Sequence, residues 1–136
     1  MKVIVDTSIW IEYLKNNHEI APGLDEGLLA GNIYMVGPVV SELLQGAKTE
    51  NDYQSLSDTI DGVPFINAEF ADWQLAGKLS FKMKKKGITI AITDCLIAAI
   101  AINNGATVYT LDQDFQSIPD VPLYNEFKGK NNRLIP

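Results

Sequence analysis

The chain has 136 residues, of which 46% are hydrophobic and 21% are charged, and this composition predicts one globular domain spanning residues 1–136. No apolar run approaches the roughly 20 residues of a membrane helix, and acids at positions 6 and 12 argue against an N-terminal signal peptide. A single cysteine, Cys95, excludes an internal disulfide and favours the reducing cytoplasm. The net charge of −6 disfavours a nucleic-acid-binding protein, unless bound cations neutralise clustered acids.

The predicted elements alternate between strands and helices along the chain. Strands are expected at residues 2–5, 33–36, 63–66 and 106–112, with a fifth, at an edge, over 121–124 because Pro122 cannot donate to a ladder. Helices are expected from residue 9 onward and over 21–31, 37–47, 51–62, 68–86 and 92–105. Such alternation predicts a central parallel sheet covered on both faces, which is a three-layer α/β/α sandwich.

Five acids are predicted to meet at one edge of this sheet. Asp6 closes the first strand, and Asp112 and Asp114 come after the "TVYT" stretch of the fourth, so all three lie at the carboxyl ends of parallel strands. A connecting helix starts at that edge, so Asp94 and Glu42, near the starts of their helices, are expected there too. The carboxyl edge is where sheets of this kind hold their functional crevice.

Each acid also has a purely structural interpretation. Asp6 is in position to cap a helix, Asp94 to complement a helix dipole with Thr93 as the cap, and Glu42 to lie on the surface. Asp112 and Asp114 are common turn residues. Together, however, crowded acids without basic neighbours must take up protons or hold a cation. Oxygen-only ligands favour Mg²⁺ or Mn²⁺ over zinc.

The order and spacing of several motifs resemble a known family. The segments "VDTSIWIEYL", "VSELLQGA", "TDCLIAAIAINNGATVYTLDQDF" and "IPDV" together are similar to PIN-domain ribonucleases, specifically the VapC-type toxins of type II toxin–antitoxin systems. The resemblance runs nearly end to end and implies a PIN-like fold. It also implies a Mg²⁺- or Mn²⁺-dependent hydrolase that cleaves RNA phosphodiesters, with tRNA or another structured RNA with exposed single strands as the expected substrate.

The resemblance also assigns roles to individual residues. The acids that match the family's catalytic, metal-binding positions are Asp6, Glu42, Asp94 and Asp112. The hydroxyls of Ser8 and Thr110 match supporting positions. The final acid varies within the family, so Asp112 is the preferred ligand here, and Asp114 is expected to support it or to replace it.

The resemblance implies protein partners as well: a second copy of the chain in a homodimer, and a cognate VapB-type antitoxin that inserts a segment into the active-site groove. The predicted helix over 68–86 carries Trp73, Leu75, Leu79 and Phe81, and not all of these side chains can face the sheet. Some apolar surface is therefore expected to remain for a partner. The lysine-rich run over 82–86 is expected to be the solvated end of this helix, with a phosphate-contacting patch as the alternative.

Other classes of protein match the sequence less well. A haloacid-dehalogenase-like phosphatase needs a second aspartate two residues after the first, where Ser8 stands. A phospho-acceptor receiver domain needs an aspartate and a lysine after later strands, and "VPFIN" and "TVYTLD" supply neither in the right place. A PIN fold kept only for protein binding is expected to have lost acids, and none is missing. A PIN nuclease of RNA processing without a toxin role shares these motifs and stays open.

Overall fold

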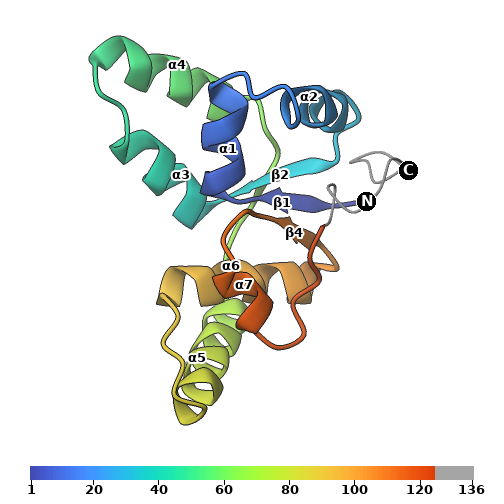
Figure 1. Cartoon of the computed structure of the whole chain (residues 1–136), viewed down its shortest axis with the longest axis vertical. Helices are drawn as coiled ribbons and strands as arrows, with labels where there is room; N and C mark the ends of the chain where they lie inside the picture. The colour runs from blue at the N-terminus through green and yellow to red at the C-terminus, as the bar shows by residue number, and fades with distance from the viewer. Residues whose placement is uncertain (125–136) are drawn as a thin grey trace.

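The computed structural model describes residues 1–124, and its elements follow the predicted alternation of strands and helices (Figure 1). Residues 125–136 of the predicted domain lie outside the described residues. The strands are β1 (Val3–Val5), β2 (Ile33–Val36), β3 (Phe65–Ile66) and β4 (Thr107–Tyr109). The helices are α1 (Thr7–Leu14), α2 (Ala21–Leu29), α3 (Gly37–Gln45), α4 (Glu50–Asp61), α5 (Phe70–Lys85), α6 (Ile92–Asn104) and α7 (Asp114–Ser117).

The strands form one parallel sheet in the order β3-β2-β1-β4. The chain adds β2 and then β3 on one side of β1, and afterwards crosses to the other side to add β4. The order of addition therefore reverses between β1 and β4. In open α/β sheets a crevice forms beyond the carboxyl ends of the strands at such a reversal, which places it beside Asp6 and Thr110.

Helices cover both faces of the sheet, as the sequence predicts. In Figure 1, α1 to α4 lie on one side of the sheet, and α5, α6 and α7 lie on the other. The whole of β1 is buried, and α6 is buried continuously from Cys95 to Ala101, because it packs between the sheet and α5. This position explains why the α6 sequence is apolar on nearly every side. The predicted α/β/α sandwich is confirmed, and the single cysteine, Cys95, is buried within α6.

Three local features differ from the prediction. β3 and β4 are shorter than predicted, and the fifth strand is reduced to a single bridge between Val108 and Leu123 at the outer edge of β4. Pro64 and Pro122 accept hydrogen bonds through their carbonyl groups but have no N–H with which to extend a ladder. The short helix α7 replaces the turn expected around Asp114. No helix within residues 1–124 is both long and apolar enough to cross a membrane.

Candidate metal centre

The carboxylate of Asp6 is buried at the end of β1, where 6% of the residue is exposed. Asp6 occupies the N-cap position of α1, but its side chain makes no capping hydrogen bond. Its Oδ2 atom instead accepts hydrogen bonds from Thr110 Oγ1 at 2.7 Å and from Ser8 Oγ at 3.1 Å. The interpretation of Asp6 as a helix cap is therefore wrong, and the predicted supporting hydroxyls are the groups that hold its carboxylate.

The register of the sheet brings these groups together. Val5 pairs with Tyr109, and the Asp6 N–H donates to the Tyr109 carbonyl at 2.9 Å, so the next residues of the two strands are neighbours. Thr110 Oγ1 also accepts from the Asp112 N–H at 2.9 Å. One hydroxyl thus links the carboxylate that ends β1 to the backbone of the segment that carries Asp112.

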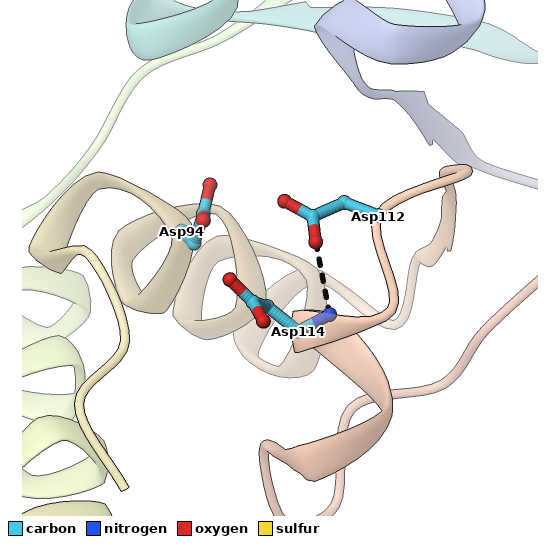
Figure 2. A group of neighbouring side chains, drawn as sticks. All are labelled: Asp94, Asp112 and Asp114. Atoms are coloured by element: carbon cyan, nitrogen blue, oxygen red, sulfur yellow. Dashed lines mark hydrogen bonds between the residues drawn. The ribbon is translucent and has the colours of Figure 1, made fainter.

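Three aspartates form a compact group beside this network, which we call the aspartate trio: Asp94, Asp112 and Asp114. A carboxylate oxygen from each lies within 4.8 Å of those of the other two. Figure 2 shows Asp94 on α6 facing Asp112 and Asp114 on the segment after β4, with the Asp114 N–H donating to Asp112 Oδ1 at 2.9 Å. The structure therefore brings both candidates for the final acid next to Asp94.

The electrostatic environment of Asp94 is unfavourable for a negative charge. Its pKa rises from the ordinary value of 3.8 to about 6. Burial is the largest cause, and repulsion from the other acids adds to it, in the order Asp6, Asp112, Glu42 and Asp114. The other four predicted acids therefore all lie close enough to Asp94 to disfavour its negative charge. Thr93 is not the cap of α6, because the N-cap residue is Ala91 and its side chain makes no capping bond.

Glu42 and Asp6 flank the aspartate trio without being part of it. Glu42 lies half-buried in the second turn of α3 and borders a groove of about 440 Å³ that separates α3 from the starts of α5 and α6. Asn67 also borders this groove and was not predicted as a site residue. Because Asn67 directly follows β3, the rule that placed Asp6 and Asp112 at the carboxyl edge identifies it too.

The residues at this edge suit a hard divalent cation. Their donor atoms are carboxylate oxygens, which Mg²⁺ and Mn²⁺ prefer over the softer nitrogen and sulfur ligands of zinc sites. Within residues 1–124, no lysine, arginine or histidine forms an ion pair with any of the five acids; the ion pair found there joins Lys15 to Glu12. Neutralisation of the aspartate trio therefore falls to protons or to a cation.

Residues 3–121 match the PIN domain family. The chain belongs to the PIN domain family, and the predicted PIN-like resemblance is confirmed. Ribonuclease VapC11 of Mycobacterium tuberculosis strain H37Rv is 36% identical to this chain over 121 residues, which cover 85% of this chain and 90% of the relative.

Solved structures of VapBC complexes share the fold. VapBC2 from Rickettsia felis, bound to a DNA fragment from its promoter, matches with 28% identity and a TM-score of 0.78, over 90% of this chain and 97% of the matched chain. DNA-bound VapBC from Salmonella typhimurium matches with 21% identity and a TM-score of 0.80, over 90% and 96% of the two chains. The likeness to VapC-type proteins therefore extends over both sequence and fold.

Proposed function

We propose that this chain is a cytoplasmic Mg²⁺- or Mn²⁺-dependent endoribonuclease that acts as the toxin of a VapBC-type toxin–antitoxin pair. The observation that carries the proposal is the aspartate trio, in which three carboxylates from two distant segments converge and the pKa of Asp94 is raised to about 6. Such crowding of like charges destabilises the folded chain, and it is typical of sites where a bound ligand neutralises the charges. The names of the relatives, which include a VapC ribonuclease, support RNA as the substrate.

Each group at the site has a role in this proposal. The aspartate trio holds the cation, with Asp6 and Glu42 as further ligands from either side. When bound, the cation supplies neutralisation of the negative charge that develops on the phosphodiester during hydrolysis. The Ser8 and Thr110 hydroxyls keep Asp6 in place, so that its charge faces the site rather than the N-terminus of α1. Because its pKa is raised to about 6, the Asp94 carboxyl group takes up a proton as the pH falls through this value.

The expected substrate is structured RNA with exposed single strands, such as tRNA. The acids at the rim repel phosphates until a cation is bound. The scissile phosphate must then approach the cation at the aspartate trio closely, because their attraction weakens with distance. A strand that can bend and splay its bases satisfies this requirement better than a rigid duplex does.

The proposed partners are a second copy of the chain and a VapB-type antitoxin. Solved relatives are toxin–antitoxin complexes, which supports the antitoxin. Trp73 and Phe81 on α5 remain exposed, whereas Trp10 and Leu79 are buried in the core. Apolar surface is therefore left for a partner, as the sequence predicts. An arginine or lysine from an antitoxin tail that reached the acids would replace the cation and inhibit the enzyme.

A cleavage assay tests the proposal. Purified chain is incubated with tRNA and with a perfect RNA duplex, in Mg²⁺, in Mn²⁺ and in excess EDTA. We expect cleavage of tRNA in either metal, little cleavage of the duplex and none in EDTA. Asp94→Asn should abolish cleavage, and the matched control Asp61→Asn, which removes one exposed carboxylate at the end of α4, should not. Undiminished cleavage in EDTA would contradict the metal role.

The toxin role has a separate test. Expression of the wild-type chain in a bacterial host should arrest growth, and expression of Asp94→Asn should not. Co-expression of a short neighbouring gene product with a DNA-binding fold should restore growth. A chain that cleaves RNA in vitro but leaves growth unchanged would instead be a nuclease of RNA processing.

A further inference from the structure

The groove that Glu42 borders differs in chemistry from the acidic site next to it. Its walls come from the start of α3, the end of β3, the first turn of α5 and the first turns of α6. Two of its lining residues are large aromatics that remain open to solvent, Trp73 at 55% and Phe65 at 49%. The chain has two tryptophans, and the other, Trp10, is almost fully buried. Two exposed aromatic rings that line the same groove form apolar surface on which a flat ligand can bind.

The groove is continuous with the candidate metal centre. Glu42 lines the groove and also contributes to the repulsion that raises the pKa of Asp94. Thr93 and Leu96, which line the groove on the α6 side, lie one residue before and two residues after Asp94. The groove therefore lies on a side of the aspartate trio where the nucleotide next to a bound phosphate has room to bind.

The charges decide which part of that nucleotide fits. Among residues 1–124, no lysine or arginine lines the groove, and the one charged lining residue is Glu42, which repels phosphate. The groove offers aromatic surface together with the side chains of Ser41, Asn67 and Thr93. Among the described residues these three make no side-chain hydrogen bond, so a hydroxyl or amide group is available to a ligand.

We propose that this groove binds an unpaired base of the RNA strand next to the scissile phosphate, with Trp73 and Phe65 as the stacking surface and Asn67 as a group that contacts the base edge. The choice of RNA as the ligand of this groove rests on the proposed function. Stacking on aromatic side chains is how proteins hold single-stranded RNA where the bases are splayed apart. It also lets an acidic protein bind RNA, because the contact with the uncharged base does not depend on neutralising phosphates.

A binding experiment with two probes tests the proposal. The probes are a single-stranded RNA hexamer and a hexamer with the same phosphates but no bases, both labelled for fluorescence anisotropy. All variants carry Asp94→Asn, so that the strand is not cleaved, and the buffer contains Mg²⁺. We expect Trp73→Ala to weaken binding of the RNA hexamer roughly tenfold, in line with the loss of one stacked base, and to leave binding of the abasic hexamer unchanged.

Two further variants provide the controls. Trp73→Phe keeps an aromatic ring and should restore most of the affinity. Phe81→Ala removes an equally exposed aromatic ring from the same helix, but outside the groove, and should leave the affinity unchanged. Quenching of tryptophan fluorescence by the RNA hexamer, absent with the abasic probe and in Trp73→Ala, gives a second readout.

Two outcomes would overturn the proposal: an RNA affinity that is the same with and without Trp73, and an equal loss of affinity for both probes in Trp73→Ala. If the unchanged affinity comes with a change from dimer to monomer in Trp73→Ala, a second copy of the chain covers the groove. If the hexamer binds through Trp73 but the wild-type chain cleaves no RNA, the proposed function fails while the groove assignment stands.

Discussion

The Thr110 hydroxyl donates a hydrogen bond of 2.7 Å to the Asp6 carboxylate, although the two residues lie 104 positions apart in the chain. The same hydroxyl accepts from the Asp112 N–H at 2.9 Å. Thr110 therefore fixes both the buried Asp6 carboxylate at the end of β1 and the backbone of Asp112 in the segment after β4. These two hydrogen bonds orient the acids from both strands toward the same site.

Removal of the Thr110 hydroxyl should weaken metal binding. In Thr110→Val the shape is nearly kept, but Asp6 loses a donor and the Asp112 N–H loses its acceptor. We expect the affinity for Mn²⁺, measured by titration calorimetry, to fall roughly tenfold, as is usual when a group that orients a ligand is lost. Thr110→Ser keeps the hydroxyl and should bind Mn²⁺ like the wild type. An unchanged affinity in Thr110→Val would show that Asp6 is held by Ser8 alone.

Substitutions of Asp6 should separate its charge from its hydrogen bonds. Asp6→Asn removes a like charge from the site and keeps an amide oxygen for the two hydroxyls, so the melting temperature of the metal-free protein should stay the same or rise. Asp6→Ala leaves both hydroxyls without this acceptor and should cost about 1–3 kcal/mol of stability. Thermal unfolding in EDTA compares the two. A large loss in Asp6→Asn would mean that the negative charge itself stabilises the fold.

The metal-free protein should become more stable as the pH falls from about 7 to about 5. The pKa of Asp94 is raised to about 6 in the folded chain, so the folded state binds a proton more tightly than the unfolded state does. The stability linked to this proton is complete below the unfolded pKa of about 4 and is lost as the pH rises through the folded pKa. Melting temperatures in EDTA across this range should show the gain.

The control for the pH effect is Asp94→Asn, which has no proton to bind at this position. When the pH is lowered from about 7 to about 5 at constant ionic strength, its melting temperature should rise less than that of the wild type. Saturating Mn²⁺ should remove the difference in slope, because the cation competes with the proton for the same carboxylate. Equal slopes in EDTA for the two proteins would contradict the raised pKa.

The two candidates for the final ligand should contribute unequally. The Asp112 carboxylate is oriented by the Asp114 N–H, which donates to Oδ1 at 2.9 Å, and its backbone is held by Thr110. Asp114 lies in the first turn of α7 and has no comparable side-chain contact among the described residues. Asp112→Asn should therefore weaken Mn²⁺ binding more than Asp114→Asn does, by calorimetry. The reverse order would make Asp114 the principal ligand.

The isolated chain should form a dimer in solution. Exposed apolar side chains on α1, α4 and α5, among them Leu14, Tyr53 and Phe81, leave surface that a second copy can cover. Light scattering at tens of micromolar, an order-of-magnitude concentration for a modest interface, should give twice the monomer mass. A strict monomer at that concentration would remove the homodimer and leave the metal centre unaffected.

The layered fold and the meeting of the acids at one edge follow from the amino-acid sequence alone. Strand and helix positions follow from local patterns, such as the apolar run before Asp6 and the apolar stretch that became α6. The edge follows from a general property of parallel sheets, in which every strand ends on the same side. Neither inference needs the detailed contacts of any side chain.

How the acids are held depends on contacts between segments that are distant in the sequence. Whether Asp6 caps α1 or accepts from Thr110 depends on the register between β1 and β4, which join residues more than a hundred positions apart. Helical periodicity likewise leaves open which side of α5 packs on α6, so only the fold buries Leu79 and exposes Trp73. Local patterns specify each element, but contacts between distant segments are fixed only when the elements pack against one another.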